Sequence, residues 1–209
     1  MFARLLAHPG VREELVLRSR FGFLAFHGGS LERFTDEVAF AAAERSSASY
    51  YAVVQPPEFR WHIPSNRVDP ACSSALAAFL AHVDVAVAVH GFGRAGLFTT
   101  LLLGGRNRQL AGHVGGHLRS HLGHYRIVDH LDDVPADLRG LHPDNPVNRP
   151  RAGGVQLELP PRVRGMGPYW HDWPGGTTPH TDALVEALAD AASSWPPSAR
   201  PGPTTVSLP

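Results

Sequence analysis

Short apolar runs alternate with alanine- and leucine-rich segments along most of the chain. The runs at residues 21–26 and 83–89 are almost continuously apolar, which is typical of buried strands. Shorter or weaker strand patterns occur at residues 11–17, 50–54, 97–103, 125–128 and 155–159. Helical patterns occur at residues 35–45, 71–82, 107–122 and 181–194. Strands that alternate with helices predict an α/β fold with a largely parallel central sheet.

The chain divides into one long domain and a short tail. Residues 1–194 contain all of the predicted strands and helices, so we expect a single domain there. Residues 195–209 are rich in proline and lack an apolar period, which predicts a loose C-terminal tail. Residues 141–153 form a long irregular segment, and long loops inside compact domains are often functional.

Composition narrows the class of protein. The 209 residues carry 19 basic and 19 acidic side chains, and all of the basic ones are arginine. This balance argues against a nucleic-acid-binding protein, which normally shows a basic excess. No apolar run is long enough to span a membrane and no leader pattern is visible, so we expect a cytoplasmic protein. A single cysteine, Cys72, excludes an internal disulfide framework and a cysteine-rich zinc site.

Histidine is unusually frequent, with 13 residues, and two of them occupy informative places. His27 and His90 each follow an apolar strand and precede glycine, and parallel sheets place ligand sites at the carboxyl ends of strands. Glu32 follows His27 closely across two glycines, which permit a tight turn. A catalytic zinc needs three nitrogen or oxygen ligands and one open position for water. His27, Glu32 and His90 could supply these ligands.

Glu158 is the candidate general base. In the strand at residues 155–159 polar and apolar residues alternate, so Gln156 and Glu158 share one face. A carboxylate in a buried strand is costly unless it is paired or functional. Beside zinc, Glu158 could accept a proton from water and pass it to a leaving amine. A structural ion pair between Glu158 and Arg162 or Arg164 is the alternative interpretation.

Three motifs in order resemble the poly-γ-glutamate hydrolase family over about residues 11–165. They are the segment from His27 to Glu32, the strand end at His90-Gly91, and residues 148–159 followed by Arg162 and Arg164. The resemblance implies a zinc-dependent amidohydrolase with a three-layer α/β/α fold, a mixed sheet and a relationship to carboxypeptidase A. It further implies one Zn²⁺ on His27, Glu32 and His90, Glu158 as general base, and γ-glutamyl amides as substrates. The His27–Glu32 spacing, H-x-x-x-x-E, differs from the H-x-x-E of carboxypeptidases.

A substrate rich in carboxylates favours arginine as its binding partner, because a guanidinium can hold a carboxylate with two hydrogen bonds. Asn148 and Arg149 lie just before the Glu158 strand, Arg164 lies just after it, and Arg67 belongs to an earlier loop. We expect one or more of these residues to bind substrate, with Arg149 and Arg164 ahead of Arg67. A solvated loop arginine is the alternative interpretation of Arg149.

Two other functions remain open at this point. One is a zinc amidase or peptidase that acts on peptidoglycan γ-glutamyl links or small N-acyl amino acids. The other is a non-enzymatic phage-type metal-binding protein, because some members of the family are described as phage-related replication proteins. We expect a small or polymeric γ-glutamyl substrate and neither nucleic acid nor membrane as a partner, whereas the oligomeric state has no sequence signal.

A second histidine cluster lacks the features of a catalytic site. His113, His117, His121 and His124 fall on one face of a predicted helix. The glutamate that a zincin needs after its first histidine is absent, because Val114 stands there. We therefore interpret these histidines as a solvated helix face.

Overall fold

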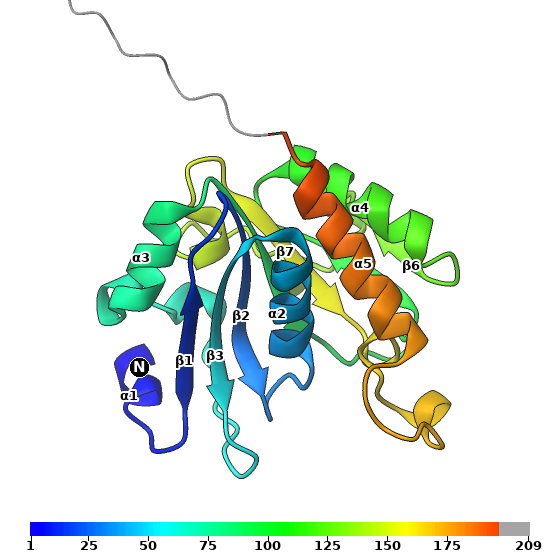
Figure 1. Ribbon diagram of the computed structural model, residues 1–209, viewed down its shortest axis with the longest axis horizontal. Coiled ribbons are helices and arrows are strands. Elements are labelled where there is room, and N and C mark those ends of the chain that lie inside the picture. Colours follow the sequence, from blue (N-terminus) through cyan, green and yellow to red (C-terminus); the bar gives the residue numbers. More distant parts are fainter. Residues whose placement is uncertain (197–209) are drawn as a thin grey trace, which may run out of the picture.

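Seven strands form one sheet with helices on both faces (Figure 1). The structure is a computed structural model that describes residues 1–196, so residues 197–209 of the predicted tail lie outside the described part. The strands are Arg12–Val16 (β1), Phe21–Gly29 (β2), Ser49–Gln55 (β3), Val85–Gly91 (β4), Thr100–Leu103 (β5), Arg126–Val128 (β6) and Gly154–Leu159 (β7). The α-helices are Phe2–Leu6 (α1), Thr35–Ser46 (α2), Ser74–His82 (α3), Arg108–His121 (α4) and Pro179–Ser194 (α5).

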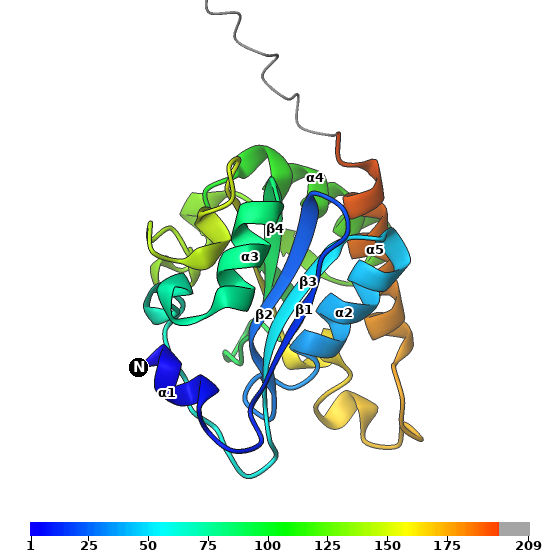
Figure 2. The ribbon, with the colours of Figure 1, turned by 60° about the vertical axis from the view of Figure 1, so that its left-hand side comes forward.

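The sheet is mixed, with a parallel centre. Its order is β1-β3-β2-β4-β7-β5-β6, and the neighbours β3-β2-β4-β7 all pair in parallel. The pairs β1-β3 and β5-β7 are antiparallel. Helices α2, α4 and α5 cover one face, and α1 and α3 cover the other (Figure 2). The predicted three-layer α/β/α architecture is therefore confirmed.

Alternation along β4 assigns its side chains to the two faces. Val85, Val87 and Val89 belong to the core beneath α2, α4 and α5. Ala86 and Ala88 belong to the core beneath α1 and α3. Because successive side chains of a strand point to opposite faces, the next residue, His90, lies on the α3 side of the sheet.

The same alternation and a parallel register bring β7 into line with β4. Val155, Leu157 and Leu159 join the core beneath α2, α4 and α5, which leaves Gln156 and Glu158 on the α3 side. Glu158 is the direct partner of His90 in the pairing of the two strands. Parallel strands end at the same edge of a sheet. Three of the predicted site residues, His27 of β2, His90 of β4 and Glu158 of β7, therefore lie near one another at this edge.

The limits of the predicted elements differ slightly from those in the structure. The strand predicted at residues 97–103 is limited to Thr100–Leu103, and α1 had no clear sequence signal. The helix predicted at residues 107–122 is confirmed as α4, and Gly115 lets it approach Asp129 closely, since an added Cβ would lie 2.7 Å from Asp129 Oδ2. Within residues 1–196 no helix is long and apolar enough to cross a membrane.

We expect Phe79→Ala to destabilise the fold by about 3–5 kcal/mol, because the ring is fully buried between α3 and the sheet and its removal leaves a cavity. Urea unfolding followed by circular dichroism measures the change. Phe98→Ala is the matched control, since Phe98 is 57% exposed and should cost less than about 0.5 kcal/mol. Equal losses in the two variants would contradict the assignment of Phe79 to the core.

Candidate metal and catalytic site

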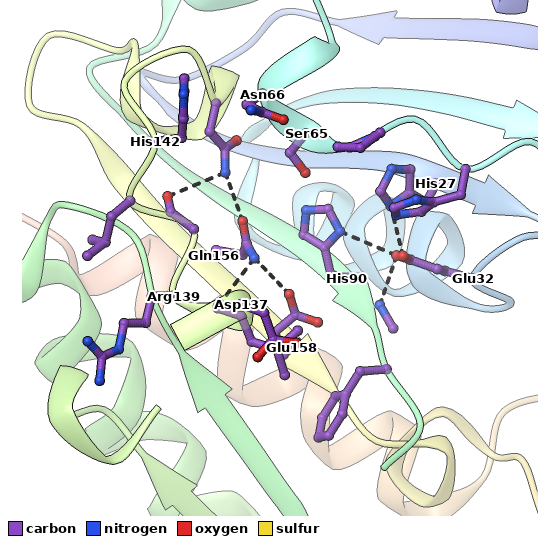
Figure 3. Close-up of a pocket in the computed structure, with 18 of the residues that line it drawn as sticks. His27, Glu32, Ser65, Asn66, His90, Asp137, Arg139, His142, Gln156 and Glu158 are labelled. Carbon is purple, nitrogen blue, oxygen red and sulfur yellow. Dashed lines mark hydrogen bonds and ion pairs between the residues drawn. The ribbon is translucent and has the colours of Figure 1, made fainter. Parts of the chain in front are cut away.

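A cavity of about 800 Å³ opens at the carboxyl ends of β2, β4 and β7. His27, Glu32, His90 and Glu158 all line it, so the structure brings the four predicted chemical residues together (Figure 3). The opposite wall comes from two loop segments, residues 62–66 and residues 136–145. The lining residues of these segments are His62, Pro64, Ser65, Asn66, Ala136, Asp137, Leu138, Arg139, Gly140, Leu141, His142 and Asn145.

His27 is turned into the cavity by an irregularity in β2. The pairing of β2 with β3 shifts register between Ala25 and Gly28, and such a bulge redirects the side chains near it. The His27 ring then has an acceptor at each nitrogen: Nδ1 lies 2.7 Å from Glu32 Oε1, and Nε2 lies 2.8 Å from the Ile63 carbonyl oxygen. A neutral imidazole has only one N–H and can donate to only one of these two acceptors. The second contact requires either a cation between Nδ1 and the carboxylate or a second proton on the ring.

His90 approaches the other oxygen of the same carboxylate. Its Nδ1 lies 3.4 Å from Glu32 Oε2, while its buried Nε2 has no hydrogen-bond partner among the described residues. Burial disfavours the charged ring, but the hydrogen bond and charge of Glu32 outweigh it and raise the pKa of His90 above its ordinary value. Two imidazole nitrogens therefore face one carboxylate from two sides (Figure 3).

Glu32 is held by its own turn and by β4. Its backbone N–H donates to the His27 carbonyl oxygen at 2.9 Å, and the Gly91 N–H donates to its Oε2 at 2.9 Å. Gly29 permits the turn, since it has φ +70° and an added Cβ would lie 2.2 Å from the Gln55 carbonyl oxygen. Burial opposes ionisation of Glu32, yet the charges and hydrogen bonds of His27 and His90 hold its pKa well below the ordinary value.

These donors fit a metal ion. A small cation between two imidazole nitrogens and a carboxylate would satisfy His27 Nδ1 while its Nε2–H donates to a backbone carbonyl, which is the usual outer-sphere arrangement of a metal-binding histidine. His62 is a further donor: ligand atoms of His27, Glu32 and His62 lie within 4.8 Å of one another. Among the described residues this close group contains His62 and not the predicted ligand His90, whose Nδ1 lies 3.4 Å from Glu32 Oε2, so either histidine can supply the third ligand.

Glu158 lies beside these donors in a separate hydrogen-bond network. Gln156 Nε2 donates to Glu158 Oε1 at 2.8 Å, and Asn145 Nδ2 in turn donates to Gln156 Oε1 at 2.8 Å. Burial, supported by the nearby charge of Glu32, raises the pKa of Glu158 above its ordinary value, although His90 and Gln156 act in the opposite direction. The site thus holds two carboxylates with opposite pKa shifts.

Two of the predicted carboxylate-binding residues are engaged elsewhere. Asn148 Nδ2 donates to the carbonyl oxygens of Gly140 and His142, and its Oδ1 accepts the Arg106 N–H. These bonds fasten the loop that forms one wall of the cavity. Neither Asn148 nor Arg164 is among the residues that line the cavity.

Arg164 is buried behind β4. Its guanidinium donates to the carbonyl oxygens of Leu159 and Arg33, and an added Cβ at Gly91 would lie 2.7 Å from the guanidinium carbon. The position of Arg164 in the sequence placed it close to Glu158, but its side chain lies on the other face of the sheet. Arg164 therefore supports the backbone beside Glu32, and its predicted contact with substrate is not supported by its position.

Arg67 and Arg149 lie outside the main cavity, in a smaller one of about 390 Å³. Both side chains are exposed, and Arg149 pairs with Asp144 at 3.3 Å. Their binding to a substrate stays a prediction.

Sequence reasoning assigned no role to His62, Gln156 or Asn145. The strand alternation that identified Glu158 also placed Gln156 on the same face, so a signal for Gln156 existed. His62 and Asn145 belong to irregular segments, where no periodicity predicts which side chains meet the site.

The histidines of α4 are not a solvated face. His113 bonds the Ala191 carbonyl oxygen at 2.9 Å, His117 bonds Ser194 at 3.0 Å, and His121 pairs with Asp190 at 3.0 Å. All three partners belong to α5, so these side chains contribute to the packing of two helices.

Known structures share this fold. The structure of a bacteriophage poly-gamma-glutamate hydrolase is similar, with a TM-score of 0.72, 23% identity and 87% of each chain covered. The zinc-free structure of YNDL has a TM-score of 0.72 and 18% identity, with 88% of this chain and 90% of that chain covered. A candidate carboxypeptidase from Burkholderia mallei has a TM-score of 0.52 and 10% identity, with 90% of this chain and 64% of that chain covered.

Sequence comparison extends the likeness from fold to family. No curated protein matches the chain significantly. The sequence model of the poly-gamma-glutamate hydrolase family, however, matches residues 4–166, which include both strand-end histidines, Glu32 and Glu158. A match over most of the domain means that this chain belongs to the poly-gamma-glutamate hydrolase family and is a hydrolase of amide bonds.

Proposed function

We propose that the protein is a zinc-dependent hydrolase of γ-glutamyl amide bonds. The observation that carries the proposal is the convergence of His27 Nδ1 and His90 Nδ1 on the two oxygens of Glu32. The buried carboxyl group of Glu158 lies on the neighbouring strand, directly paired with His90. Two imidazoles, one carboxylate and a separate carboxyl group form the donor set of a catalytic zinc site with a general base.

Zinc, when bound by His27, Glu32 and His90, lowers the pKa of a water molecule and polarises the carbonyl oxygen of an amide. Glu158 accepts the proton of the attacking water and returns it to the nitrogen of the leaving group. Burial suits Glu158 to this exchange, because a carboxyl group with a raised pKa holds a transferred proton better than a solvated one.

Gln156 orients the base. Its amide nitrogen donates to Glu158 Oε1, which leaves the other carboxylate oxygen for the water, and Asn145 fixes the orientation of the amide. Membership of the family supports γ-glutamyl links as the substrate class.

The metal proposal is tested by zinc analysis of purified variants. We expect the parent chain to bind about one zinc and His90→Ala to lose most of it, because loss of one of three ligands weakens binding strongly. His171→Ala is the matched control, since the His171 side chain is 84% exposed. If His62→Ala loses the metal and His90→Ala retains it, the proposed ligand set is wrong.

The reaction proposal is tested with a panel of γ-linked and α-linked glutamyl peptides. We expect the zinc-loaded enzyme to cleave the γ-linked peptides, and Glu158→Gln to lower kcat by about 100-fold or more while it retains zinc. Cleavage of α-linked peptides alone would overturn the γ-glutamyl assignment. Full activity of a zinc-loaded Glu158→Gln variant would overturn the role of Glu158.

The orienting role of Gln156 is tested by Gln156→Leu, which keeps the side-chain size and removes the donor. We expect kcat to fall by about 10- to 100-fold with little change in KM or zinc content, since a misplaced base slows the chemical step. In the Glu158→Gln background the same substitution should have almost no further effect, because Gln156 acts through Glu158. Asn148→Ala is the control for loosening of the loop. If Gln156→Leu lowers kcat as much in the Glu158→Gln background as in the parent, the assignment of Gln156 is contradicted.

A further inference from the structure

Two cavities of the molecule lie side by side, and we call the two together the groove. Asn66 lines both the main cavity and the smaller cavity of about 390 Å³. The loop that supplies Ser65 to the first cavity continues into Arg67 and Asp69 of the second. The opposite loop likewise supplies Asn145 to the first cavity, and its residues Asp144 and Arg149 line the second.

The groove runs away from the metal site. Figure 3 places Asn66 and His142 at the side of the main cavity that is remote from Glu32. Asn66 is the residue that the two cavities share, so the smaller cavity lies beyond it as seen from the metal ligands. A ligand that reaches this outer cavity while bound at the metal site must therefore be an extended chain.

The outer cavity is lined by two arginines, Arg67 and Arg149, and by two aspartates, Asp69 and Asp144. Arg67 has no ion-pair partner within residues 1–196, and Arg149 has one exposed contact, with Asp144 at 3.3 Å. The acidic residue Asp69 is engaged by its own loop, since its Oδ1 accepts the Ala71 N–H at 2.9 Å. Exposed ion pairs such as Arg149–Asp144 are weak and exchange readily with another carboxylate.

We propose that Arg67 and Arg149 form an outer subsite for a carboxylate of the substrate chain, at least one unit away from the bond that is cleaved. The proposal rests on the proposed function, since a γ-linked glutamyl chain carries a free α-carboxylate on every unit. Guanidinium groups hold carboxylates with charge-assisted hydrogen bonds, so the outer cavity matches such a chain chemically. The subsite makes the enzyme favour long anionic chains over short ones.

The test compares the double variant Arg67→Ala/Arg149→Ala with the parent on γ-glutamyl oligomers of increasing length. The measured quantity is the ratio of kcat/KM for the longest oligomer to kcat/KM for the shortest oligomer that is cleaved. We expect this ratio to fall by about tenfold or more, since two charge-assisted contacts are lost. Arg45→Ala is the matched control. The Arg45 side chain is 45% exposed and pairs with Glu186 of α5. An unchanged ratio, or an equal fall in Arg45→Ala, would overturn the outer subsite.

A binding measurement separates the subsite from the hydrolytic function. The anisotropy of a fluorescently labelled γ-glutamyl decamer reports binding without cleavage when each protein is measured in the zinc-loaded Glu158→Gln background. Weaker binding by the double variant than by Arg45→Ala, at low and moderate salt, supports the subsite even if hydrolysis fails. If the parent cleaves the oligomers but binds the decamer as weakly as the double variant, only the subsite is wrong. If the parent neither binds nor cleaves them, both proposals are overturned.

Discussion

The partly buried carboxylate of Glu32 is the charge around which this end of the sheet is organised. A carboxylate is costly to remove from water unless cations or donors surround it. His27, His90 and the Gly91 N–H supply that environment. The turn that carries Glu32 is fixed as well, because Arg164 holds the next carbonyl from behind β4. The Glu32 carboxylate and its turn thus receive contacts from three segments: the bulge in β2, the end of β4 and the segment after β7.

The second carboxylate is set apart by the register of the sheet. Glu158 pairs with His90 across β4 and β7, so hydrogen-bonded backbone determines its place relative to the metal-binding donors. Its pKa is raised by burial, whereas that of Glu32 is lowered by the two histidines. Opposite pKa shifts in neighbouring carboxyl groups suit them to the two roles proposed above, an ionised group that binds a cation and a carboxyl group that exchanges a proton.

Charge is distributed unevenly along the groove. Arg139 is the one arginine among the described residues that line the main cavity, and its guanidinium donates to the Val134 carbonyl oxygen at 2.9 Å. A free guanidinium near Glu32 or Glu158 would compete with a metal ion and with the transferred proton for those carboxylates. Arg67 and Arg149 line the smaller cavity, and neither is among the residues that line the main one.

The residue pattern of the chain was enough to predict most of the strands and α-helices, the alternating core, and four residues that the structure brings together at one cavity. Strand and helix periodicity are local properties, and the strand-end residues His27, His90 and Glu158 are brought together by the rules of parallel sheets. Glu32 was predicted to join them because it follows His27 across two glycines, which permit a tight turn. Which loop residues line the cavity depends on tertiary contacts. His62 and Asn145 enter it, and Arg164 turns away from it, because contacts between irregular segments depend on long-range packing that no short-range pattern encodes.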